Sequence, residues 1–329
     1  MNALVTGGGG FLGHSICKQL VARSDRVRSF GRGIYPELEA LGVEVVRGDI
    51  RDASAVSAAC VGVDCVIHTA ALAGLQHPSR PFFQINVDGT RNVLAACKRH
   101  HVGRLVYTSS PSVTFTGQDQ CGVDESAPYA TEWLASYPRT KAIAEQAVLA
   151  CDHLRACALR PHLIWGPRDR HLIPRLIARA RAGRLRRVGD GTNLIDMIFV
   201  ENAAEAHLQA ADALDKENSP VHGKAYFLSQ GEPVNCWQWI DDILELAGLP
   251  PVEKSISQKS AWRVGAVCEA AYRLLRLSGE PPMTRFLAAQ LATSHWFDIS
   301  AAQRDVGYQP RITTAEGMRK LGEWLLEQA

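Results

Sequence analysis

Tyr137 and Lys141 are the residues whose types and spacing point most directly to chemistry, since they stand four positions apart. On a helix, this spacing places the phenol and the ammonium about one turn apart on the same face. A positive charge beside a phenol favours the phenolate and lowers its pKa from about 10. Such a phenol can give or take a proton next to a carbonyl or an alcohol. Tyrosine and lysine often stand at this spacing by chance, so the elements before them decide its meaning.

Ser110 is the third candidate, and it stands 27 residues before Tyr137, just past the predicted strand 104–108. A hydroxyl at the carboxyl end of a strand can hydrogen-bond the same substrate oxygen that the tyrosine protonates. Pro111 restricts the residue before it to extended geometry and so helps to fix this hydroxyl. The three side chains together predict a proton-transfer site at an alcohol or a carbonyl.

A glycine motif opens the chain and supplies the context. The apolar run 2–6 ends in Gly7, Gly10 and Gly13, and residues 14–21 have helical spacing. In a strand–turn–helix unit, the first glycine permits a tight turn and the second lets the backbone approach a pyrophosphate. The third lets the helix pack closely, and the helix N-terminus attracts phosphate. This order favours dinucleotide binding over a plain glycine-rich turn.

The end of the second predicted strand, 27–30, bears on which dinucleotide is bound. An acidic residue there would bind the ribose 2′-hydroxyl of NAD, but Gly31 and Arg32 follow instead. A guanidinium suits a 2′-phosphate. The alternative is an ordinary solvated loop arginine. The sequence therefore favours NADP over NAD.

Further predicted strands at 43–46 and 63–68, and a helix from Asn86 to Lys98, continue the alternation of strands and helices. We therefore predict an α/β fold with a doubly wound, mostly parallel sheet. Residues 1–167 are predicted to form the dinucleotide-binding domain, with sheet contributions from later segments. Residues 168–329 are predicted to be mainly a substrate-binding lid. His68, in an apolar strand, is expected to be structural.

The composition is that of an ordinary globular protein and excludes several functions. Hydrophobic residues are 46% of the 329 residues, charged residues are 21%, and the net charge is +2. So small a charge predicts no nucleic-acid partner. The nine cysteines form no C-x-x-C pair or zinc spacing, so we expect reduced, mostly buried thiols and no metal site. Without a targeting segment or an apolar run near the roughly 20 residues of a membrane span, a cytoplasmic protein is expected.

These motifs resemble those of the extended short-chain dehydrogenase/reductases over nearly the whole chain. In that family, the matched tyrosine is the acid/base, the serine orients the reacting oxygen, and the lysine lowers the tyrosine pKa and holds the nicotinamide ribose. The family also implies a homodimer. The likeness is carried by Thr6-Gly7-x-x-Gly10-x-x-Gly13, Gly48-Asp49, His68-Thr-Ala-Ala71, Asn86-Val-x-Gly-Thr90, Tyr107-Thr-Ser-Ser110, Tyr137-x-x-x-Lys141, Leu159-Arg-Pro161 and Ile164-x-Gly-Pro167.

The residues and the resemblance together predict the whole site. The catalytic residues are expected to be Ser110, Tyr137 and Lys141. The expected cofactor contacts are Gly7, Gly10, Phe11, Leu12, Gly13, Arg32, Asp49, Ile50, Thr69, Ala70, Ala71, Asn86, Thr108, Tyr137, Lys141 and Pro161.

Within the family, the segments 107–115, 124–129 and 193–202 resemble the 3β-hydroxysteroid and sterol-4-carboxylate dehydrogenase branch. The nearest resemblance is to bacterial ketoreductases of long-chain olefin biosynthesis, which act on 2-alkyl-3-oxoalkanoic acids. A long-chain acyl substrate is thus expected. A steroid dehydrogenase would share every catalytic residue. A sugar-nucleotide epimerase/dehydratase would usually have Val-Tyr-Gly where Val113-Thr-Phe115 stands, and a non-catalytic NADP-binding regulator would not need the intact triad.

Two basic segments in the second half have more than one interpretation. Arginines between 179 and 187 suit either a solvated helix end or an anion site. Residues 262–277 place apolar side chains at helical spacing among arginines. They suit a lid helix or an amphipathic helix that contacts a membrane surface or another pathway enzyme.

Overall fold

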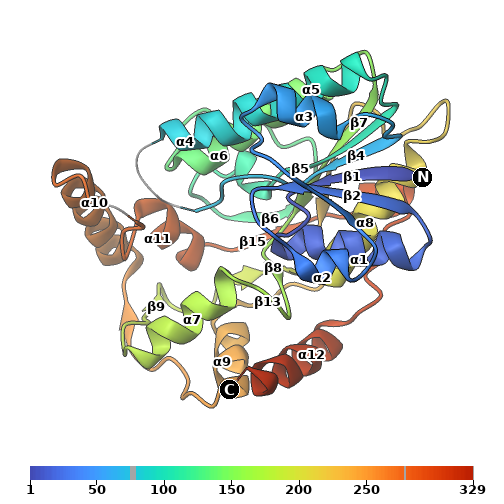
Figure 1. Cartoon of the computed structure of the whole chain (residues 1–329). Coiled ribbons are helices and arrows are strands. Elements are labelled where there is room, and N and C mark those ends of the chain that lie inside the picture. Colours follow the sequence, from blue (N-terminus) through green and yellow to red (C-terminus); the bar gives the residue numbers. More distant parts are fainter. Residues whose placement is uncertain (75–78, 278, 329) are drawn as a thin grey trace.

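The computed structural model describes residues 1–74, 79–277 and 279–328. Its centre is a seven-stranded parallel sheet in the order β3-β2-β1-β4-β5-β7-β12 (Figure 1). The chain winds outward from β1 on one side and then on the other, which confirms the doubly wound fold. The strands are β1 (Asn2–Thr6), β2 (Arg26–Gly31), β3 (Glu44–Arg47), β4 (Cys65–His68), β5 (Arg104–Thr108), β7 (Arg155–Pro161) and β12 (Ala225–Leu228).

Helices cover both faces of this sheet, because its central strands are apolar on both sides. α1 (Phe11–Ala22) and α8 (Val200–Ala213) lie together on one face and share a buried core with it. The other face is covered by α3 (Ala53–Ala59), α5 (Gly89–Arg99) and α6 (Ser136–Leu149). Since α8 and β12 come from the second half of the chain, the sheet and its covering helices draw on both halves.

The helix predicted from Asn86 begins earlier than expected. A turn of α-helix, α4 (Arg80–Phe82), leads into the π-helical turn η1 (Phe83–Asp88), and α5 continues it. Pro81 stands at a first position of α4, where its missing N–H costs nothing. Asn86 therefore lies inside a helical segment.

The C-terminal region adds three small sheets and a separate apolar core around Trp165, Trp237 and Trp239. A four-stranded sheet has the order β13-β10-β15-β6, and two further pairs are β11-β8 and β14-β9. These strands are β6 (Gln120–Val123), β8 (Ile164–Trp165), β9 (Arg187–Val188), β10 (Leu194–Ile195), β11 (Ile198–Phe199), β13 (Val234–Asn235), β14 (Ser255–Ile256) and β15 (His295–Phe297).

Of the remaining helices, α2 and η3 pack on the core of the main sheet, and α7, α9 and α12 pack on the second core. α10 lies beside α11 at the edge of the molecule (Figure 1). In the described part of the chain, none of the helices is long and apolar enough to cross a membrane. Their bounds are α2 (Pro36–Glu39), η2 (Pro111–Val113), α7 (Leu172–Arg181), α9 (Cys236–Leu246), α10 (Gln258–Leu274), α11 (Arg285–Ala292), η3 (Ala302–Val306) and α12 (Thr314–Glu327).

These packing details bear on two expectations from the sequence. All nine cysteines are free and seven are buried, as predicted. In the arginine run, Arg179 donates to the carbonyl of Pro282 at 2.9 Å and Arg187 pairs with Asp241 at 2.9 Å. These two arginines thus have partners within the protein.

Candidate active site

A groove of about 390 Å³ opens at the carboxyl ends of β1, β2, β4 and β5. It lies where the strand order reverses, which is the usual ligand crevice of a doubly wound sheet. Most of the predicted cofactor contacts line it. They are Gly7, Gly10, Phe11, Leu12, Gly13, Arg32, Asp49, Ile50, Thr69, Ala70, Ala71, Thr108, Tyr137 and Lys141.

The glycine turn of this groove fits a dinucleotide. Gly7 has φ of +74°, a left-handed conformation that glycine adopts without strain. A Cβ at Gly13 would lie 2.2 Å from the carbonyl oxygen of Gly7, so only glycine allows this close approach. Gly10 caps the N-terminus of α1 without a side-chain hydrogen bond. The positive end of the helix therefore faces the groove and can receive a pyrophosphate.

The ends of β2 and β3 form the far part of the groove. Tyr35, which the sequence did not single out, packs where a Cβ on Gly9 would lie 2.1 Å from its ring. Asp49 accepts two hydrogen bonds from the Arg51 guanidinium, at 2.7 and 2.9 Å. These bonds lower the pKa of Asp49 to about 2, so the carboxylate is an acceptor near pH 7. Arg32 lines the same part of the groove, next to Gly31.

Two predicted cofactor contacts lie elsewhere. Asn86 is buried: its Oδ1 accepts from the Leu72 N–H at 2.7 Å, and its Nδ2 donates to the Leu72 carbonyl and the Thr140 hydroxyl, each at 3.0 Å. It therefore fixes the loop after β4 against α6 and does not line the groove. Pro161 lines a neighbouring cavity instead. Strand order locates the groove but does not give the direction of a side chain, so the sequence alone could not place these two residues relative to it.

That neighbouring inner cavity has a volume of about 170 Å³, and Tyr137 lines both it and the groove. Ser110 lines the inner cavity, as expected for a group that orients a reacting oxygen. Its hydroxyl lies 2.8 Å from the hydroxyl of Ser112. Ser110, Tyr137 and Lys141 are thus gathered around the junction of the groove and the inner cavity.

The protonation of Tyr137 differs from expectation. Burial raises the pKa of its phenol, and a hydrogen bond with Ser110 opposes this effect. The ammonium of Lys141 is not directed to the phenol: it donates to the carbonyl of Thr108 and lies 4.1 Å from the Tyr107 ring centre. Burial lowers the pKa of Lys141 to about 7. In the protein without cofactor, the phenol is therefore a neutral proton donor.

A buried ion pair joins α6, the helix of Tyr137 and Lys141, to the central sheet. Arg160, in β7, donates to Glu145 of α6 at 2.6 Å, and the Tyr129 hydroxyl donates to the same carboxylate at 2.7 Å. Glu145 and Lys141 lie four residues apart on α6, so the carboxylate also favours the charged form of the lysine. The pair therefore fixes both the position and the electrostatics of the helix.

A chain of buried histidines forms part of the inner cavity wall. His295 Nε2 donates to the Gln290 carbonyl at 2.8 Å, and burial lowers the pKa of His295 to about 4. Since that ring is neutral near pH 7, its Nδ1 must accept, so His162 Nε2 donates to it at 3.1 Å. His162 Nδ1 lies 2.6 Å from Asp196 Oδ1. Sequence patterns do not reveal this set of residues, because its members come from distant segments.

His68 has the structural role expected of it. Its ring bonds the hydroxyls of Thr6 at 2.6 Å and Thr90 at 3.0 Å. Burial lowers its pKa to about 3, so it stays neutral in the core.

The groove is also lined by ten residues that were not predicted from the sequence. They are Phe30, Gly31, Tyr35, Gly48, Leu72, Ala73, Ile85, Ser109, Ile164 and His171.

Comparisons with known proteins agree with this geometry. The model of the 3-beta hydroxysteroid dehydrogenase/isomerase family matches residues 4–257. A Stenotrophomonas maltophilia protein named 2-alkyl-3-oxoalkanoate reductase is 51% identical over 326 residues, which is 98% of each chain. A Shewanella oneidensis protein of the same name is 48% identical, over 97% of this chain and 85% of its own. The solved structure of MoeE5 with UDP-glucose and NAD is 25% identical, with a TM-score of 0.74, over 100% of this chain and 99% of its own.

Proposed function

The chain belongs to the 3-beta hydroxysteroid dehydrogenase/isomerase family, and we propose that it is an NADP-dependent ketoreductase of long-chain 2-alkyl-3-oxoalkanoic acids. The reaction converts the 3-keto group to the 3-hydroxy acid. The observation that carries the proposal is that Tyr137 lines both the dinucleotide groove and the inner cavity. The substrate class is supported by the names of the Stenotrophomonas and Shewanella relatives.

The residues of the chain have distinct tasks in this reaction. When bound, the nicotinamide supplies a hydride to the carbonyl carbon. Tyr137 donates its phenolic proton to the carbonyl oxygen as negative charge develops there. Ser110 donates a hydrogen bond to the same oxygen and keeps it beside the phenol. Lys141 holds the ribose, and its charge then stabilises the phenolate that remains.

We further propose that the reaction belongs to long-chain olefin biosynthesis and takes place in the cytoplasm in a homodimer. The pathway and the dimer follow from the resemblance to the family. Other enzymes of that pathway are the expected protein partners.

The substrate is tested in the alcohol direction, which avoids 3-oxo acids that decarboxylate readily. The purified protein is given a racemic long-chain 2-alkyl-3-hydroxy acid or a 3β-hydroxysteroid, each with NADP⁺ and with NAD⁺. We expect reduction of NADP⁺ with the hydroxy acid. Turnover of the steroid alone would contradict the proposed substrate and leave the catalytic roles standing.

A 3β-hydroxysteroid or sterol-4-carboxylate dehydrogenase is the second candidate, because the matching family model is named for that activity. A sugar-nucleotide epimerase/dehydratase is the third, since the related MoeE5 structure holds UDP-glucose and NAD. An enzyme of that third class would be inactive with both alcohols.

The cofactor preference is tested separately at Arg32. Replacing Arg32 by Gln removes the guanidinium proposed to bind the 2′-phosphate. We expect kcat/KM for NADP⁺ to fall about tenfold or more, as for the loss of a charge-assisted contact, while the value for NAD⁺ changes little. Equal losses with the two cofactors would assign Arg32 to folding.

A further inference from the structure

α10 is held against the rest of the protein by one face only. Ala261, Gly265 and Glu269 are buried on that face, where α10 packs on α11. A Cβ at Gly265 would lie 2.5 Å from the backbone of Thr284, so the two helices are in close contact there. Glu269 accepts from the N–H and the guanidinium of Arg285, at 2.7 and 2.8 Å. The orientation of α10 is therefore fixed.

This orientation directs an apolar stripe to solvent. Positions 264, 267, 271, 274 and 275 follow the spacing of one helix face, and we call this stripe the outer face of α10. Its large side chains are exposed: Val264 by 45%, Val267 by 68%, Leu274 by 83% and Leu275 by 65%. A contiguous apolar stripe of this kind on a surface marks an interaction site.

The charged side chains of the α10 segment are mainly basic. The segment 258–277 contains four basic residues and a single acid, Glu269, which is buried and paired with Arg285. An apolar face with basic residues around it is complementary to an anionic lipid surface, since the apolar side chains enter the interface and the cations remain at the headgroups. The basic residues are Lys259, Arg263, Arg273 and Arg276, of which Arg273 lies on the inner side of the helix and lines a cavity there.

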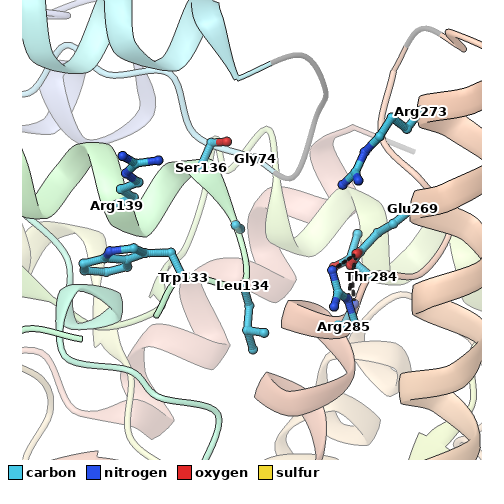
Figure 2. A pocket seen from close by; sticks show the side chains of 10 residues that line it. Gly74, Trp133, Leu134, Ser136, Arg139, Glu269, Arg273, Thr284 and Arg285 are labelled. Carbon is cyan, nitrogen blue, oxygen red and sulfur yellow. Dashed lines mark hydrogen bonds and ion pairs between the residues drawn. The ribbon is translucent and has the colours of Figure 1, made fainter. Parts of the chain in front are cut away.

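The inner side of α10 borders a second cavity, which we call the outer cavity. It has a volume of about 380 Å³ and lies between α6 and the α10–α11 pair, with Arg139 on one side and Arg273 and Arg285 on the other (Figure 2). Its residues Ser136 and Arg285 directly precede Tyr137 and Phe286 of the inner cavity. The helix with the exposed apolar face therefore also lies close to the inner cavity.

We propose that the outer face of α10 docks the enzyme on an anionic phospholipid surface. The purpose we give to this docking, delivery of a long-chain substrate, rests on the proposed function. The inner cavity is below the roughly 300–1,000 Å³ of drug-sized pockets, so it holds the reacting head but not two long chains. An enzyme docked through α10 receives its apolar substrate from the lipid phase, close to the inner cavity.

The test is sedimentation of the full chain with phosphatidylcholine vesicles and with mixed phosphatidylcholine/phosphatidylglycerol vesicles. We expect binding to the mixed vesicles that weakens as salt is added. The double variant Val267→Gln/Leu274→Gln should lose at least about tenfold in affinity for the vesicles, because burial of the apolar side chains supplies the anchoring. The matched control is Leu326→Gln, a change at a side chain 76% exposed on α12, which should bind like the unaltered protein.

Each other outcome overturns the docking. Absence of sedimentation with mixed vesicles at low salt excludes it. Equal binding by the double variant assigns any binding to another surface. If gel filtration shows a dimer that the double variant dissociates, the face is an interface between two copies of the chain. Turnover of a short-chain, water-soluble 2-alkyl-3-hydroxy acid should be the same in the double variant, so failure of docking and failure of the proposed function are distinguishable.

Discussion

At the scale of single residues, the proposed reaction depends most on the phenol of Tyr137, which donates the proton. Tyr137→Phe keeps the ring that lines the groove and removes only the proton donor. We expect kcat to fall by about 10²–10⁴-fold, the range for loss of general acid catalysis. NADPH affinity, measured by fluorescence titration, should stay nearly unchanged. A large loss of NADPH affinity would mean that the hydroxyl serves cofactor binding.

Lys141 gives a prediction about stability and pH. Its pKa is about 7 in the folded protein against an ordinary value of 10.5, so the unfolded chain binds more protons between these values. Stability of the cofactor-free protein should therefore rise as the pH rises through this window and be lowest below pH 7. Lys141→Met removes the cost of burying a protonated amine. The Tm of this variant near pH 6 should exceed that of the unaltered protein by a few degrees (about 2–4 °C per kcal/mol).

The comparison is made by thermal unfolding of both proteins between pH 6 and 10.5 without cofactor. The gain should shrink toward the upper end of the range. A gain that is the same at every pH would show that packing, and not the charge, accounts for it.

The sequence could predict residues that follow directly after a strand, because all parallel strands end at one edge of the sheet. Thr69, Ala70 and Ala71 were predicted in this way and line the groove. The histidine chain could not be predicted, since His162 lies 34 residues from Asp196 and 133 from His295, and only tertiary packing joins them. The prediction that Lys141 lowers the pKa of Tyr137 does not hold in the protein without cofactor, for a related reason. Helix spacing places Lys141 on the same face but does not reveal that its ammonium donates to the Thr108 carbonyl.

At the scale of elements, α1 makes a close backbone contact with the glycine turn. Gly13→Ala would place a methyl group 2.2 Å from the Gly7 carbonyl oxygen, so helix and turn must separate. We expect NADPH affinity to fall at least tenfold, because the N–H groups that receive the phosphates are displaced, and Tm to fall as well. The control is Gly103→Ala, where the nearest atoms are 3.9 Å away. If both variants lost affinity equally, close packing would not be the reason for glycine at 13.

At the scale of the whole molecule, the prediction of a dinucleotide-binding domain ending at residue 167 can be tested by truncation. α8, from the second half, contributes much of the buried core on one face of the sheet, and β12 pairs with β7 at the sheet edge. A fragment of residues 1–167 would expose this apolar surface. We expect it to be insoluble or unfolded by circular dichroism, whereas a fragment of residues 1–228 should recover native-like secondary structure. A cooperative thermal transition in the shorter fragment would contradict this expectation.

The return of the chain to its first sheet also has a consequence for synthesis on the ribosome. All three residues proposed to be catalytic are translated by position 141, yet β12 ends at Leu228. At about 5–20 residues per second, the roughly 60 residues between position 167 and the end of β12 take about 3–12 s to add. During that interval the nascent sheet has one face that α1 covers only in part and one open edge, so this is the stage at which a chaperone would be needed.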